Sequence, residues 1–326
     1  MLPPGPASAR PAAGALAPAT AEPLPDGSGG ALPRPSLRAA ATMLASCGFF
    51  TLMSLAIGEA HRAEPALSST AASAVRSAVN LAVLLVMARG NVKFLLGDRR
   101  LALWLRGLAG ATALLTYFAA LGLVGVGEAA FLNNTSTFWV AALAPLLIGE
   151  RARPLVWVAV LGSLVGTAAL GLPREGHHDT LGRVLGAISG LAAAFAYLSV
   201  RKASASNPPQ VIVFYFIAVS TLVCIVLALV QPVTWPAAAS TWAWLVLAGL
   251  TATGGQLTMT RAYQLGPVAP IAALSTATPL FTALAGVLFL DEHPDRLAVF
   301  GMGLLAAFGV GLPLVEAAAR GRAGKA

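Results

Sequence analysis

Charged residues are scarce in this sequence: Asp, Glu, Lys and Arg make up 10% of its 326 residues, against about 25% in a typical soluble domain. A water-soluble fold of this length would need charged side chains at short intervals along its surface. Long apolar runs instead follow one another with only brief polar breaks. The scarcity of charge argues against a soluble protein and predicts an all-α integral membrane protein in a lipid bilayer.

Other absences narrow the function further. The two cysteines, Cys47 and Cys224, lie in apolar runs, which argues against a disulfide framework or a thiolate metal site. Despite the net charge of +8, the basic residues form no stripe interleaved with aromatic side chains, so nucleic acid is not expected as a partner. No glycine-rich phosphate loop follows a strand, which argues against an ATP-driven pump. Because His177, His178 and Asp179 are adjacent and cannot easily converge on one ion, neither a metal nor a cofactor is expected.

The chain opens with residues 1–37, which are rich in proline, alanine, glycine and serine and typical of a disordered tail. This tail lacks the charged start and apolar core of a signal peptide, so the first hydrophobic segment after it should be retained. About ten apolar segments follow, each long enough to span a bilayer. They cover residues 38–58, 67–88, 101–121, 127–148, 154–172, 181–200, 210–231, 239–262, 267–290 and 297–316.

The basic residues also predict an orientation. If the N-terminus is cytoplasmic, most of the 21 Lys and Arg residues fall in inner loops and termini, and only Arg62, Arg174, Arg183 and Arg296 lie in outer loops. This skew matches the positive-inside rule. We therefore expect a multi-pass protein of the inner (plasma) membrane with both termini cytoplasmic.

The two halves of the chain share a pattern. One offset aligns Ala120 with Ala262 and also Glu150 with Glu292, a charged residue that ends the fourth and the ninth segment alike. Five spans per half is an odd number, so the second copy should enter the membrane inverted. The expected organisation is a tail over 1–37, a five-helix repeat over 38–172, a periplasmic linker over 173–180, an inverted five-helix repeat over 181–316 and a basic cytoplasmic tail over 317–326.

Two segments carry a family resemblance: AAFLNNTSTFWVAALAPLLIGE, ending at Glu150, and RAYQLGPVAPIAALSTATPLFTALAGVLFLDE, ending at Glu292. With them, the chain resembles the EamA-type members of the drug/metabolite transporter superfamily over roughly residues 38–316. The resemblance implies two five-helix repeats and a transport role without naming a solute. Thr137 stands where the second repeat has Pro279, and since proline removes a backbone hydrogen bond, the sequence does not predict equivalent kinks.

Arg76, in AVRSAVNLAVLL, resembles the arginine common in that family's second helix. An unpaired guanidinium at this depth would cost at least about 2.5 kcal/mol, so Arg76 should face the bundle interior or water. Its planar fork of donors suits a carboxylate or phosphate of a solute. A structural ion pair or a snorkelling side chain explains its position equally well.

Polar side chains inside the fourth and ninth segments predict a solute site. Asn133, Asn134 and Thr137 in one, and Ser275 and Thr278 in the other, would line a midplane cavity between inverted repeats. Alternatively, they hold helices together at about 0.6 kcal/mol per contact. Walls and a further hydrogen bond for such a pocket could come from Tyr117, Trp139, Tyr197, Tyr215, Gln256 and Tyr263.

Other residues are expected to be structural. Glu150 and Glu292 end their helices beside turns, where a carboxylate can accept hydrogen bonds from the start of the next helix. Glu128, at the outer end of the fourth segment, is expected to be an ordinary surface carboxylate. Glycines at four-residue spacing let the fifth and sixth helices approach closely, within the protein or in a homodimer. They are Gly162, Gly166, Gly182, Gly186 and Gly190.

We therefore expect a secondary transporter or facilitator, not an enzyme, that moves an amino acid, metabolite or vitamin-like compound by alternating access. The alternatives are a membrane enzyme or lipid-handling protein and a scaffold that kept the fold without transport.

Overall fold

The computed structural model describes residues 35–171, 179–289 and 293–323, which form helices and their connections and contain no strand. The all-α fold class is therefore confirmed for these residues. The helices are α1 Leu37–Ala63, α2 Ser69–Met87, α3 Val92–Leu95, α4 Leu101–Val124, α5 Val126–Asn134, α6 Ser136–Leu147, α7 Pro154–Gly171, α8 Thr180–Ala203, α9 Pro209–Val230, α10 Ala239–Leu265, α11 Val268–Ser275, α12 Ala277–Phe289, α13 Arg296–Leu304, the π-helix η1 Leu305–Gly311 and α14 Leu312–Ala323.

Short polar residues start several of these helices. The hydroxyls of Ser36 and Ser68 accept hydrogen bonds from the N–H groups of Ala39 and Ala71, each three residues further along the chain and 3.1 Å away. Asp179 and Asp295 cap α8 and α13 in the same manner. Each cap satisfies a backbone donor that has no partner inside its own helix. The apolar segments therefore begin at residues that sequence alone marks as helix starts.

Two of the spanning segments are interrupted. The α5–α6 segment breaks at Thr135 and the α11–α12 segment at Thr276. Pro279 explains the second break, because it lacks the N–H that would bond to the carbonyl of Ser275. The first break has no proline; instead, the hydroxyl of Thr137 donates to the carbonyl of Asn134 over 3.0 Å. The two halves thus share a break that the Thr137/Pro279 difference gave no reason to expect.

Among the described residues, eight helical stretches are long and apolar enough to cross a membrane. The predicted segments 127–148 and 239–262 are not among them. Polar residues lower the hydropathy of both, Asn133 and Asn134 in the first and several Thr, Gly and Gln residues in the second. The α11–α12 stretch is included although it is also interrupted. The count of ten and the inverted repeats therefore remain predictions. Large apolar side chains on the outside of the bundle, such as Leu229 at 81% and Leu146 at 80% exposure, suit contact with lipid.

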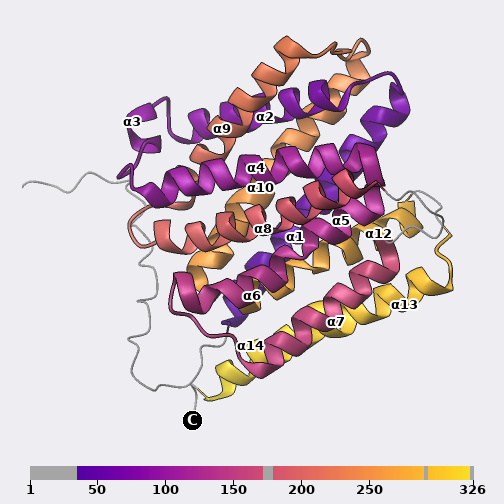
Figure 1. The fold of residues 1–326 in the computed structure, drawn as a ribbon. Coiled ribbons are helices and arrows are strands. Elements are labelled where there is room, and N and C mark those ends of the chain that lie inside the picture. The colour runs from indigo at the N-terminus through magenta and orange to yellow at the C-terminus, as the bar shows by residue number, and fades with distance from the viewer. Residues whose placement is uncertain (1–34, 172–178, 290–292, 324–326) are drawn as a thin grey trace, which may run out of the picture.

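The helices pack so that the two halves of the chain interleave. α1 lies along α10, and α4 lies along α8 and α9, so each pairing joins the first half to the second. Figure 1 shows α7 beside the yellow α13–α14 rod along one side of the bundle, and α2 and α9 together on another side. The bundle interior is thus lined by helices from both halves.

The spaced glycines of α7 and α8 do not bring these two helices together, because each set packs against other helices. A Cβ at Gly166 would lie 2.9 Å from the carbonyl oxygen of Gly301 on α13, and one at Gly190 would lie 2.5 Å from that of Leu132 on α5. The glycines of α7 therefore admit α13 and η1, while those of α8 admit α4 and α5. Whether the protein forms a homodimer stays a prediction.

Candidate functional site

A cavity of about 1020 Å³ lies inside the bundle. Most of its lining comes from α1, α4, α5, α8, α10 and α12, with single residues from α6, α9 and α11 and further residues from the end of α7 and from α13. Most of the lining is apolar, and a smaller number of polar groups face the same space, which is the usual composition of a small-molecule site. Helices of both halves therefore contribute to one cavity.

One end of this cavity, which we call the mouth, is lined by Glu59, Arg62, His293, Pro294 and Ala298. Arg62, His293 and Pro294 are exposed, the other two are half-buried, and Glu59 forms an ion pair with Arg62. They lie at the C-terminal end of α1 and at the start of α13. The mouth is thus a polar, accessible rim.

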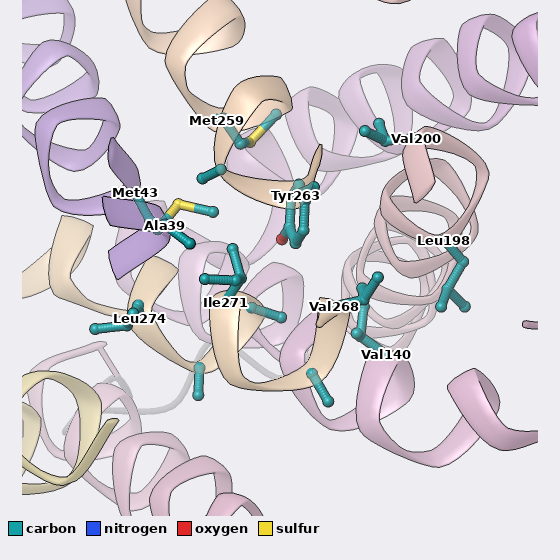
Figure 2. Close-up of a cluster of buried hydrophobic side chains, with 14 of the residues drawn as sticks. Ala39, Met43, Val140, Leu198, Val200, Met259, Tyr263, Val268, Ile271 and Leu274 are labelled. Carbon is teal, nitrogen blue, oxygen red and sulfur yellow. The ribbon is translucent and has the colours of Figure 1, made fainter. Parts of the chain in front are cut away.

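The other end, which we call the floor, is closed by Met43, Met259, Tyr263, Ile271 and Leu274. Met43 and Met259 line the cavity and also belong to a fully buried hydrophobic cluster. Figure 2 shows the side chains of Tyr263 and Ile271 close to those of Met43 and Met259. Because apolar side chains from α1, α10 and α11 meet here, the cavity ends blind on this side.

A buried ion pair supports the floor. Arg201 Nε on α8 lies 2.8 Å from Glu150 Oε1, and both side chains are almost completely buried. The second carboxylate oxygen, Oε2, accepts the N–H of Val268 over 2.8 Å at the start of α11. Glu150 therefore bonds a helix start, but of a helix in the other half rather than the next one along the chain. Glu292 lies outside the described residues.

A second ion pair, nearer the mouth, also involves an arginine of α8. Arg183 Nε on α8 lies 2.6 Å from Glu128 Oε1 at the start of α5. Glu128 is 4% exposed, so the expectation of a surface carboxylate was wrong: α8 covers it and supplies its partner. Arg183 keeps 43% of its side-chain exposure. Asp179 caps the start of α8, while His177 and His178 lie outside the described residues.

Seven residues proposed from sequence for the solute site line the cavity together. Within the described residues, the amide oxygens of Asn133 and Asn134 accept no hydrogen bond. Tyr197 stacks on Tyr263, with ring centroids 5.4 Å apart. The lining members of the proposed set are Tyr117, Asn133, Asn134, Tyr197, Gln256, Ser275 and Thr278.

Five others of the proposed set do not line the cavity, and one of them, Tyr263, belongs to the buried cluster of the floor. Arg76 lies behind the wall, with Nη1 3.6 Å from the sulfur of Met53, a lining residue. Tyr215 donates its hydroxyl to the carbonyl of Leu96 over 2.9 Å. Thr137 bonds the carbonyl of Asn134 across the α5–α6 break, and Trp139 packs edge-on against Phe138. These side chains are engaged elsewhere in the fold.

Arg106 lines the cavity and was not proposed from sequence. It was counted among the basic residues of the inner loops, although it lies well inside the apolar run 101–121. Its Nη2 donates to Gln256 Oε1 over 3.0 Å, and its guanidinium carbon lies 4.4 Å from the ring centroid of Phe216. The signal that sequence offered was an arginine more than one turn inside a spanning segment.

Loops tie the helices together at each end. Near the mouth, the Glu64 carboxylate accepts the N–H of Ala237 over 3.0 Å, and this hydrogen bond holds the pKa of Glu64 below its ordinary value. At the floor end, Ser206 donates to Asp98 Oδ2, which joins the α3–α4 and α8–α9 connections. Both contacts link the first half of the chain to the second.

Comparison with known families identifies the fold. The sequence pattern of the EamA-like transporter family matches residues 37–172 and again residues 180–312. The resemblance to EamA-type members of the drug/metabolite transporter superfamily is thereby confirmed. The two matches together cover most of the chain.

Individual relatives agree with this match. Pseudopaline exporter CntI of Pseudomonas aeruginosa is 32% identical over 204 residues, which are 61% of this chain and 70% of the exporter. Solute carrier family 35 member G1 of Homo sapiens is 23% identical over 226 residues, 65% of this chain and 62% of the carrier. A solved crystal structure of 21% identity superposes with a TM-score of 0.73 over 86% of this chain and 98% of its own, which supports the fold.

Proposed function

Because the chain belongs to the EamA-like transporter family, we propose that it is a secondary transporter that carries a small organic solute by alternating access. The observation that supports this most is the cavity, which has a polar mouth at one end and a closed apolar floor at the other. A solute site that communicates with one side at a time is what alternating access requires. Membership of a transporter family gives no support to the enzyme alternative.

We further propose that the termini are cytoplasmic and the membrane is the inner membrane. The excess of Lys and Arg on the side of both termini supports this orientation. The mouth would then face the periplasm, since α1 runs from the N-terminal side toward Glu59. Export is the proposed direction, because the Pseudomonas relative is an exporter.

Flux through reconstituted vesicles tests the transport proposal. Labelled amino acids, vitamins and nucleosides would be screened in proteoliposomes against empty vesicles. At least one solute should cross faster with the protein, and Asn134→Ala should slow it while Leu222→Ala, on the exposed surface of α9, should not. If no solute of the panel crosses faster than in empty vesicles, the transport proposal fails for these classes.

Reporter fusions test the orientation separately. A reporter fused after Ala203 should read cytoplasmic and one fused after Gln231 periplasmic, since α9 lies between them. The reverse pattern would overturn the proposed orientation and leave the transport proposal untouched.

A further inference from the structure

Arg106 is a nearly completely buried cation that faces the cavity. Its side chain is 2% exposed and belongs to the cavity lining. One of its nitrogens, Nη2, donates to the neutral amide oxygen of Gln256, and Phe216 lies under the guanidinium. Nε is buried and has no hydrogen-bond partner among the described residues. An arginine offers five N–H donors, so most of its hydrogen-bonding capacity is unused.

The charge of Arg106 is not balanced within the described part of the chain. No carboxylate there forms an ion pair with it. The titratable groups that interact with it electrostatically are the hydroxyls of Tyr197 and Tyr263. Buried Arg201, in contrast, has the carboxylate of Glu150 at 2.8 Å. Phe216 and Gln256 offset only part of the cost of removing a cation from water. The site is therefore short of one negative charge.

Glycine keeps the space around this cation open. A Cβ at Gly110, one turn further along α4, would lie 2.6 Å from Cδ2 of Phe216 and would collide with Nη1 of Arg106. A Cβ at Gly107 would lie 2.8 Å from the carbonyl oxygen of Tyr215, so that glycine admits α9. The absence of a side chain at Gly107 and at Gly110 therefore lets α9 approach α4 and leaves room for the guanidinium against Phe216.

We propose that Arg106 binds the carboxylate of the transported solute, which is then a monocarboxylate with a largely apolar body. This assignment rests on the proposed transport function. A carboxylate accepts two parallel hydrogen bonds from a guanidinium, which suits the unused donors. The other lining arginine, Arg62, already pairs with Glu59. Among the described residues, the cavity therefore offers one unpaired arginine, which matches one negative charge rather than the higher charge of a phosphate monoester. Met43, Phe50 and Met259 line the cavity where the apolar body would lie.

Matched pairs of solutes test this assignment. Hippurate, N-acetyl-L-leucine and 3-indolepropionate would be compared with their primary amides for binding to purified protein, measured by ligand-induced thermal stabilisation. At least one carboxylate should bind the unaltered protein tenfold or more tightly than its amide. In Arg106→Gln this preference should fall by about tenfold to hundredfold, which is the loss of a charge-assisted pair of hydrogen bonds.

The ratio of carboxylate to amide affinity is measured on one preparation, so it does not depend on the yield of folded variant. Arg106→Lys keeps the charge without the fork and should show an intermediate ratio, while Gly110→Ala should lower the ratio by displacing the guanidinium. If Arg106→Gln does not fold, these two variants carry the test. Lys202→Gln removes an exposed positive charge and should leave the ratio unchanged.

Two results would overturn the assignment: no carboxylate preference in the unaltered protein, or a preference that survives in the Arg106 and Gly110 variants. Flux of the same panel separates this failure from failure of the transport proposal. If carboxylates and amides cross equally fast, and both faster than in empty vesicles, in the unaltered protein and in Arg106→Gln alike, transport stands and the anion assignment falls because no carboxylate preference exists. If nothing crosses, the transport proposal itself fails for this panel.

Discussion

At the floor of the cavity, apolar side chains from three helices meet and a buried ion pair lies behind them, whereas at the mouth the charged side chains of α1 remain partly exposed. The same helix, α8, carries an arginine toward each end. Arg201 is 6% exposed in its pair with Glu150, and Arg183 is 43% exposed in its pair with Glu128.

This difference assigns different mechanical roles to the two ends. Opening the floor would expose apolar surface and separate a desolvated ion pair, and both steps are costly. Rearranging the mouth would move side chains that water already solvates. Under the proposed alternating access, the free-energy cost of opening the floor therefore needs more offset than that of opening the mouth, and under the proposed assignment the solute charge at Arg106 is one source of it.

The largest expected effect is at the floor pair. Glu150→Gln leaves the guanidinium of Arg201 buried without a counter-ion and weakens the bond to the N–H of Val268. We expect it to lower the free energy of unfolding by about 3–5 kcal/mol. Unfolding in detergent, followed by circular dichroism against denaturant, measures the change. A double replacement, Glu150→Leu with Arg201→Leu, should recover part of the loss, and an effect of Glu150→Gln below about 1 kcal/mol would contradict the described burial.

The apolar layer of the floor gives the second effect. Ile271 is 0% exposed, so Ile271→Ala leaves a cavity and should cost about 2–5 kcal/mol. The same unfolding measurement applies. Leu222→Ala on the exposed face of α9 serves as the control and should change stability by no more than about 0.5 kcal/mol. Equal losses for the two variants would mean that the floor is not a packed layer.

Much of the architecture was predictable because apolar runs and caps are local signals. The polar patch at Asn133 and Asn134 also predicted part of the cavity lining, since amides inside a spanning helix need a polar neighbour. Both breaks in the interrupted helices lie beside that patch or its counterpart at Ser275.

The remaining features depend on contacts between distant segments. Arg106 and Arg76 both interrupt apolar runs, and sequence favoured Arg76, yet packing places Met53 between Arg76 and the cavity. Arg106 reaches the cavity because α9 and α10 bring Phe216 and Gln256 beside it. Glycine contacts were equally non-local: a repeat of small residues predicts a close approach but not which helix approaches.

A smaller effect is expected for the ion pair nearer the mouth, which sharpens the comparison along α8. Glu128→Gln leaves Arg183 without its partner, but this guanidinium is exposed enough to be solvated by water or headgroups. The expected loss of stability is about 1 kcal/mol, well below that of Glu150→Gln. Because both variants exchange Glu for Gln and leave an arginine of α8 behind, they form a matched pair. Similar losses at both sites would remove the distinction between floor and mouth.

The smallest expected effect concerns pH at the mouth end. The carboxylate of Glu64 accepts the N–H of Ala237, and this contact lowers its pKa in the folded protein. A lowered folded pKa means that the contribution is present above the ordinary glutamate pKa of about 4.3 and is lost as the pH falls through the folded pKa. Glu64→Gln should therefore lower the melting temperature slightly at pH 7, and the gap to the unaltered protein should close at acidic pH. A gap that widened on acidification would show that the carboxylate is not held by this loop, and that the mouth is tied together by other contacts.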